Sequence, residues 1–227
     1  MFFYNDPTFL LLIPALILAV YAQFKVKSTF EKYSQVPAKS GLSASSVSKH
    51  LLADAGLGAI RINKVEGELT DHYDPRDKTL NLSSSVFDSN SVAAIGVAAH
   101  EVGHAVQDSK AYAPLAARNN LVPAANLGSQ LSIPLFFMGL IFSTPLLMDI
   151  GIIAFSIAVA FQVITLPVEF NASSRAIKLL SDGGYLESSE IPMAKAVLNA
   201  AALTYVAATA MAILNLIRLL ALRNERD

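Results

Sequence analysis

The stretch Ala99-His100-Glu101-Val102-Gly103-His104-Ala105 lies inside a run of small and apolar residues that predicts a helix from Val92 to about Val106. Polar residues at 88–91 precede this run and offer several N-caps. On a helix, His100 and His104 are one turn apart and project from the same face. Because alanine, valine and isoleucine dominate the first part of the run, we expect this helix to be buried on most sides.

The two histidines form the pattern H-E-x-x-H, in which imidazoles on one helical face bind one zinc ion. Glu101 then lies next to the metal and can accept a proton from a water molecule. The alternative is a pair of histidines that only fill a core. Buried charge is costly unless it is compensated, and a metal ion would compensate it here. The pattern therefore favours a zinc site.

The composition indicates a membrane protein. Of the 227 residues, 53% are hydrophobic and 15% are charged, whereas about 25% of the residues of a soluble domain are charged. The mean hydropathy is +0.47, and lipid-facing surfaces must be apolar. The formal net charge is -1, which gives no reason to expect a nucleic acid partner. The chain has no cysteine, so disulfides and thiolate metal ligands are excluded.

Residues 1–24 are predicted to form an N-terminal transmembrane anchor. Residues 9–24 are apolar apart from Tyr21 and Gln23, and with their flanks they approach the roughly 17–25 residues that span a bilayer. A cleavable signal peptide is the alternative, but signal peptides begin with basic residues, and residues 1–8 contain none. Lysines follow the segment instead, at Lys25, Lys27, Lys32 and Lys39. The positive-inside rule then places residue 25 onward in the cytoplasm.

Residues 25–115 are the polar part of the chain and are predicted to form a zincin-like catalytic region. The segment 43–55 has the pattern of an amphipathic helix that stops at Gly56. Residues 60–62 and 79–82 alternate in polarity around a turn at 74–78, which predicts a small antiparallel hairpin or meander. Its edge at 68–82 could hold an extended peptide by main-chain hydrogen bonds, or the hairpin could simply cover the zinc helix.

Residues 116–168 are predicted to form a weakly polar connector or amphipathic helix over 116–130, followed by a membrane hairpin. The apolar runs 132–148 and 150–168 imply a short turn at 147–149, and Pro167 is expected to kink or end the second run. Residues 169–227 are predicted to contain a polar helix to Asp182 and a C-terminal membrane helix over 195–222. Four spans would place the basic C-terminal end outside, against the positive-inside rule.

A catalytic zinc site needs a third protein ligand and an open position for water. No histidine follows His104, so the third ligand must be a carboxylate or one of the upstream histidines, His50 and His72. His50 lies beside the apolar face of the 43–55 helix, which favours a structural role. Among the carboxylates, Glu169 lies at the inner end of the returning span, so the membrane hairpin would bring it to the side of His100 and His104.

Three parts of the chain resemble the YugP-type neutral zinc metallopeptidases of bacterial membranes. They are Ser91 to Gln107, Asp71 to Arg76 with Leu80, Leu82 and Ser83, and Glu169 to Ala176. More distantly, the chain is similar to HtpX and the CAAX prenyl proteases. In those families a glutamate in an E-x-x-x-D segment completes the zinc site, and the resemblance assigns this role to Glu169. Ser173 stands where the aspartate would be, so Ser173 or Asn171 is expected to orient the ligand histidine instead.

The sequence therefore predicts a mainly α integral membrane protein with about four transmembrane helices, a helical zincin-like core and a small antiparallel β-hairpin. The expected activity is that of a zinc-dependent endopeptidase with Glu101 as general base. His72, Tyr73 and Arg175 are candidate donors to the oxyanion, although a hairpin role for the first two and a lipid-headgroup or ion-pair role for Arg175 are simpler.

The expected partners are the lipid bilayer and membrane-associated protein or peptide substrates, with the site on the cytoplasmic face of the cell membrane. One alternative is a non-proteolytic metal-binding scaffold, which would have no need of Glu101. Another is a metal transporter, which would need ionisable residues inside the spans.

Overall fold

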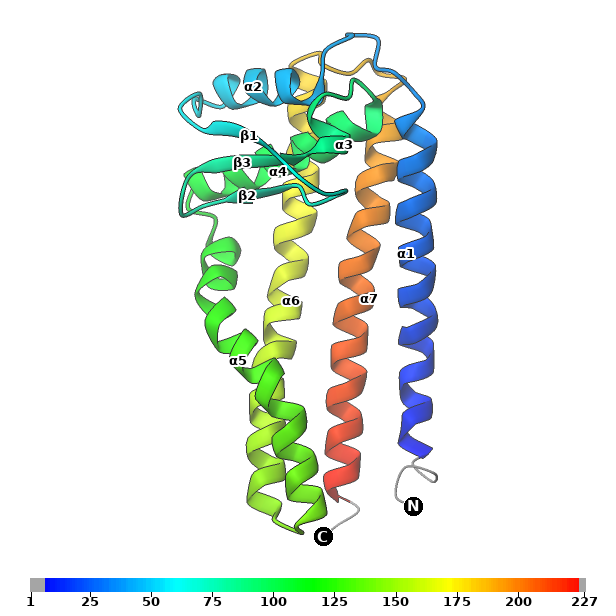
Figure 1. Ribbon diagram of the computed structural model, residues 1–227, viewed down its shortest axis with the longest axis vertical. Coiled ribbons are helices and arrows are strands. Elements are labelled where there is room, and N and C mark those ends of the chain that lie inside the picture. Colours follow the sequence, from blue (N-terminus) through cyan, green and yellow to red (C-terminus); the bar gives the residue numbers. More distant parts are fainter. Residues whose placement is uncertain (1–6, 225–227) are drawn as a thin grey trace. The chain divides into compact units, whose positions relative to one another are not determined.

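The computed structural model describes residues 7–224 (Figure 1). These residues form two compact units. We call the first the sheet unit, which comprises residues 23–115 and 168–203. We call the second the span unit, which comprises, among the described residues, 7–22, 116–167 and 204–224. Several of the long helices contribute residues to both units.

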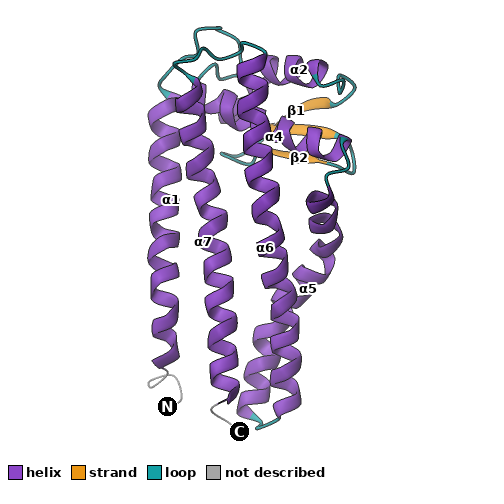
Figure 2. Cartoon of the chain, turned by 180° about the vertical axis from the view of Figure 1, so that it is seen from behind, coloured by secondary structure: helices purple, strands orange, loops and turns teal. Residues whose placement is uncertain are grey.

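Within residues 7–224, four helical segments are long and apolar enough to cross a membrane. They are α1 (Ile13–Ser34) with the preceding 3-10 helix η2 (Pro7–Leu12), α5 (Ala113–Ile141), α6 (Pro145–Asp182) and α7 (Ile191–Asn224). Figure 2 shows how far helices outweigh strands in this chain. The predicted class, a mainly α membrane protein with about four spans, is confirmed.

The turn between α5 and α6 differs from the prediction. It occupies residues 142–144 rather than 147–149, and Asp149 lies in the first turns of α6 (Figure 1). Ser143 has a positive φ of 53°, which ends α5, and Pro145 takes the first position of α6, where its missing N–H costs nothing. The segment 116–130, predicted as a connector or an amphipathic helix, is helical as part of α5, which runs through Pro123 and Pro134 without a break.

Pro167 does not end its span, because α6 continues from Pro145 to Asp182 as one helix. Beyond the proline, Val168, Ala172, Ala176 and Leu180 have 0% exposure. Their spacing of four residues makes one buried stripe along α6. This packing stabilises the helix past a residue that cannot donate to the preceding turn.

The end of α7 is tied to the start of α6 within the span unit. Nε of Arg223 donates to Oδ1 of Asp149 over 2.8 Å. The basic C-terminal part of α7 therefore lies at the same end of this unit as the α5–α6 turn. The ion pair offsets one of the positive charges that stood against the positive-inside rule.

The sheet unit contains a three-stranded sheet of order β1-β3-β2, made of β1 (Arg61–Val65), β2 (His72–Asp74) and β3 (Thr79–Ser83). The predicted hairpin is present, since β2 and β3 pair antiparallel. A meander is not, because β1 pairs parallel with β3. The strand with the most buried residues, β3, takes the centre, and alternation of polarity cannot reveal that order.

Three helices pack against this sheet and against one another: α2 (Ala44–Asp54), α3 (Ser84–Phe87) and α4 (Val92–Ser109). The hydroxyl of Ser43 caps α2 and that of Ser91 caps α4. Gly56 follows α2 with a φ of 74°, which confirms the predicted stop. Most of α4 is buried, as expected from its small residues, so the histidines of α4 are held in a rigid core.

Candidate metal centre

His100 and His104 project from the same face of α4. Their ring centroids are 4.7 Å apart and their planes are nearly perpendicular, at 85°. His104 is buried, with 8% exposure, and His100 is partly buried. The helical spacing read from the sequence therefore produces two imidazoles that converge on one point.

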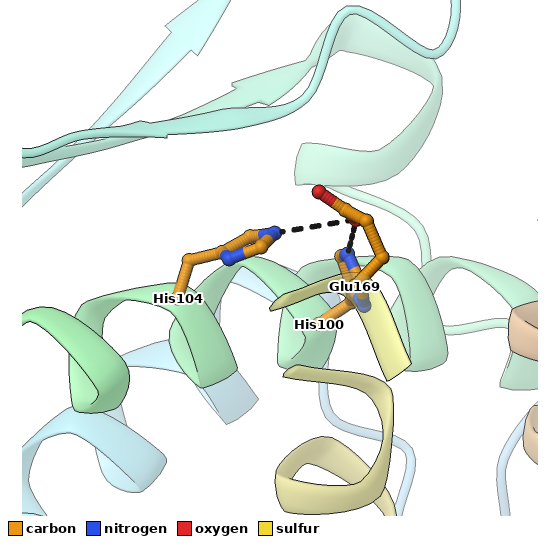
Figure 3. Close-up of side chains that lie close together, drawn as sticks. All are labelled: His100, His104 and Glu169. Carbon is orange, nitrogen blue, oxygen red and sulfur yellow. Dashed lines mark hydrogen bonds and ion pairs between the residues drawn. The ribbon is translucent and has the colours of Figure 1, made fainter. Parts of the chain in front are cut away.

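Glu169 of α6 meets the two histidines at that point (Figure 3). Its Oε2 lies 3.2 Å from Nε2 of His100 and 3.6 Å from Nε2 of His104. The ligand atoms of the three residues all lie within 4.8 Å of one another. Both α4 and this part of α6 belong to the sheet unit.

The donor set suits zinc. Two imidazole nitrogens and one carboxylate oxygen are the protein ligands of one class of catalytic zinc site, which keeps a fourth position for water. The carboxylate of Glu169 is only 3% exposed, and a buried anion between two histidines is compensated by a divalent cation. His50, His72 and Asp108 lie outside this group of potential ligands.

Gly103 allows α6 to approach α4 at this site. A Cβ atom at position 103 would lie 2.5 Å from the backbone oxygen of Ala172, which is closer than real contacts allow. Ala172 lies between Glu169 and Ser173 along α6, so the close approach of the two backbones is what brings Glu169 to the histidines. The glycine inside H-E-x-x-H thus has a packing role that the zinc pattern alone does not require.

Glu101 lies beside the histidines on α4 and is buried, with 9% exposure. Its Oε2 accepts a hydrogen bond from the backbone N–H of Tyr73 over 3.1 Å. Burial raises the pKa of the Glu101 carboxyl, and the nearby His100 and His104 oppose that rise only in part. The carboxylate is therefore held in place and is more basic than that of an exposed glutamate.

Each histidine has a second hydrogen bond on the far side of its ring. Nδ1 of His100 lies 3.1 Å from the hydroxyl of Ser173. Nδ1 of His104 lies 3.0 Å from Oε1 of Gln107. Ser173 stands at the position of the aspartate in the E-x-x-x-D families, and it contacts His100. Of the two residues predicted to orient a ligand histidine, Ser173 therefore makes such a contact.

Gln107 was missed from the sequence. It is completely buried and bonds to α6 through its amide nitrogen. The signal that could have revealed it is a glutamine three residues after His104 on a helix expected to be buried, since a buried amide needs partners.

The two other predicted catalytic residues lie outside the metal-binding group. Nδ1 of His72 is 2.9 Å from the carbonyl of Thr70, and its Nε2 is 3.2 Å from the amide of Asn81. Nε of Arg175 donates to Oδ1 of Asn171 over 2.7 Å, and its guanidinium lies 5.9 Å from the ring centre of Tyr112. Their catalytic roles stay predictions.

Tyr73 links the hairpin to the metal helix by its side chain as well as its backbone. Its hydroxyl donates to Oδ2 of Asp108 over 2.8 Å, and Lys78 also pairs with Asp108. Burial first, and then the Asp108 carboxylate, raises the pKa of Tyr73 above its ordinary value. The β2–β3 turn is therefore anchored to the last turn of α4.

His50, predicted to be structural, stacks on Tyr185 with 5.9 Å between the ring centres.

Residues 8–224 match the model of a protein family described as "putative neutral zinc metallopeptidase". The chain belongs to this zinc metallopeptidase family. It is also 45% identical over 218 residues to a protein of Bacillus subtilis (strain 168) named "Putative membrane protease YugP", and the match covers 96% of this chain and 97% of that relative. No solved structure matches the chain. The family and the three converging side chains together identify zinc as the cofactor.

Proposed function

We propose that this protein is a membrane-embedded, zinc-dependent endopeptidase with Glu101 as its general base. The observation that carries the proposal is the convergence of His100, His104 and Glu169 beside a buried glutamate on the same helix. We assign the three converging residues as the metal ligands. Membership of a zinc metallopeptidase family supports peptide hydrolysis as the reaction.

Zinc bound in such a site lowers the pKa of a water ligand toward about 7 and polarises the scissile carbonyl. The protein supplies the proton transfers. Glu101 accepts a proton from the attacking water on its carboxylate and then passes it to the amine that leaves. The hydrogen bond from the Tyr73 N–H orients this carboxylate, and the raised pKa of Glu101 suits a group that must both accept and donate a proton near neutral pH.

We propose β2 as the strand that binds the substrate. It forms one edge of the sheet, because the strand order is β1-β3-β2. An extended peptide can add to such an edge by main-chain hydrogen bonds, and the Tyr73 N–H on this strand already contacts Glu101. A peptide bound there would lie next to the proposed general base. This is why we infer protein or peptide substrates, and the four candidate spans favour membrane-associated ones.

Arg175 is the best of the three candidate oxyanion donors, because the hydroxyl of Tyr73 already donates to Asp108. The carbonyl of Thr70 can only accept a hydrogen bond, so Nδ1 of His72 carries the proton and its Nε2 accepts from Asn81. A neutral His72 in this form has no second proton to donate. Arg175 is always charged and lies on the same helix as Glu169, so we expect Arg175→Gln to lower kcat more than His72→Asn.

We propose that the centre faces the cytoplasm from the cell membrane. The lysines in the second half of α1, at positions 25, 27 and 32, favour the cytoplasmic side for the end of α1. A reporter fused at residue 227 should then lie on the outer side of the membrane, since three further spans separate the end of α1 from the C-terminus. A cytoplasmic reporter at residue 227 would contradict this topology.

The proposal is tested with the wild type and Glu101→Gln, purified in detergent. Both proteins are expected to bind one zinc ion, while cleavage of an unfolded protein such as casein falls by about 100-fold to 10,000-fold in the variant, the usual contribution of a general base. If both bind zinc and neither cleaves casein or a panel of membrane-derived peptides, the alternative gains support: a metal-binding scaffold that assists another protease.

A further inference from the structure

Gln107 bridges the two helices that carry the proposed metal ligands. It lies on α4, one turn past His104, and its side chain makes three hydrogen bonds. Oε1 faces Nδ1 of His104 over 3.0 Å. Nε2 donates to the backbone oxygen of Val168 over 2.8 Å and to Oδ1 of Asn171 over 3.0 Å. Every hydrogen-bonding group of the amide except one oxygen lone pair is thereby used, in a side chain with 0% exposure.

The direction of these bonds is determined by their partners. The carbonyl of Val168 can only accept a hydrogen bond, so the nitrogen of the Gln107 amide must face α6 and its oxygen must face His104. Asn171 is oriented in the same way, because Nε of Arg175 can only donate to its Oδ1. The network therefore has one consistent set of donors and acceptors from Arg175 to His104.

This direction determines the tautomer of His104. An amide oxygen accepts only, so Nδ1 of His104 must carry a proton, and in the neutral imidazole Nε2 then carries none. That nitrogen is the one 3.6 Å from Oε2 of Glu169. Ser173 places no such constraint on His100, because a hydroxyl can donate or accept.

The bridge also acts on the third ligand. Val168 precedes Glu169 directly, and Asn171 follows it by two residues. Two hydrogen bonds from one buried amide thus hold the backbone and a side chain of α6 on either side of Glu169. The same amide holds His104 on α4.

We propose that Gln107 is a positioning residue of the metal centre: it holds His104 in the tautomer that binds metal through Nε2, and it ties α4 to α6 beside Glu169. The inference rests on the proposed metal site. A neutral amide, rather than a carboxylate, performs this task here. Removing an outer partner of a metal ligand typically lowers metal affinity about 10-fold to 100-fold.

The test is the zinc affinity of Gln107→Met, measured by chelator competition on the full chain in detergent. Methionine has a similar length but cannot make the three hydrogen bonds. Ser48→Ala is the matched control, because it deletes a fully buried hydrogen bond in α2, from the Ser48 hydroxyl to the carbonyl of Ala44. We expect zinc affinity to fall about 10-fold or more in Gln107→Met and to stay unchanged in Ser48→Ala.

A cobalt-loaded sample gives a second readout. The visible spectrum of cobalt depends on ligand geometry, so it should change in Gln107→Met and stay the same in Ser48→Ala. If Gln107→Met keeps both the zinc affinity and the cobalt spectrum of the wild type, the inference is overturned. His104→Ala tests the metal site separately from the role of Gln107. Unchanged zinc binding in that variant would refute the proposed metal site itself.

A measurement on the wild type covers the case in which Gln107→Met does not fold. Nitrogen NMR of 15N-labelled histidine in the zinc-loaded protein reports which ring nitrogen carries the proton. Of the four histidines, His50 and His72 can be assigned with His50→Gln and His72→Gln, and the two that remain are distinguished by Ser173→Ala, which removes the partner of Nδ1 of His100. We expect a protonated Nδ1 and a metal-bound Nε2 at His104. The opposite arrangement would overturn the inference without any change at Gln107.

Discussion

Gly103→Ala is expected to damage the metal centre with little effect on folding. The added Cβ would lie 2.5 Å from the backbone oxygen of Ala172, whereas an ordinary carbon–oxygen contact is about 3.3 Å. The neighbouring atoms are backbone and cannot rotate away. The helices α4 and α6 would therefore have to separate by about 0.8 Å, the difference between these two distances.

The separation of α4 and α6 is large compared with the tolerance of a metal site, but it is moderate for the packing of a hydrophobic core. Metal–ligand distances tolerate about 0.2 Å, so we expect zinc affinity to fall at least about 10-fold and kcat/KM about 100-fold. Overpacking costs about 1–3 kcal/mol, but alanine gains about 1 kcal/mol over glycine in a helix. The free energy of unfolding should therefore fall by only about 0–2 kcal/mol.

Gly96→Ala on the same helix is the matched control. Its Cβ would lie 3.4 Å from Cβ of Ala194, an ordinary contact. Zinc affinity by chelator competition, casein cleavage and thermal unfolding are measured for both variants. Gly96→Ala should behave as the wild type in zinc binding and cleavage. If Gly103→Ala also keeps wild-type zinc affinity, the close approach of α4 and α6 does not position Glu169, and the reasoning is refuted.

Three further predictions follow from the same contacts. Glu169→Ala should abolish stoichiometric zinc binding, measured by metal analysis after dialysis, and retained zinc would exclude Glu169 as a ligand. Tyr73→Phe should lower the free energy of unfolding by about 1 kcal/mol, because it deletes the hydrogen bond to Asp108. Its zinc content should stay at the wild-type level, and a loss of zinc would show that the hydroxyl serves the metal centre directly. Activity is lost as the general base is protonated. The raised pKa of Glu101 should therefore move the acid limb of the pH profile of kcat/KM above the ordinary glutamate value of 4.5. Full activity down to pH 4.5 would contradict a buried base.

The class of this protein and the core of its metal centre could be predicted from the sequence because they depend on local patterns. Helical spacing alone places His100 and His104 on one face, and the length of the apolar runs alone predicts about four spans. Glu169 was predicted from the return of a membrane hairpin and from a family resemblance, and it lies within hydrogen-bonding distance of His100.

The details that local patterns do not determine were missed or misplaced. Pro167 was expected to kink or end its span, but α6 does not end there, and the buried stripe at 168, 172, 176 and 180 stabilises its continuation. The strand order of the sheet could not be predicted either, because alternating polarity identifies strands but does not show which strands pair.

By itself, the sequence determined which residues can serve as zinc ligands, because the chemistry of histidine and glutamate and the pitch of a helix are local properties. Only the tertiary structure decided how those ligands are held. The hydrogen bond from the Tyr73 N–H to Glu101 joins residues that are 28 positions apart. The approach of Ala172 to Gly103 joins residues 69 positions apart. The side chain of Gln107 bonds to two residues of α6 that lie 61 and 64 positions later. Such contacts arise from the packing of one element on another, and no local pattern specifies them.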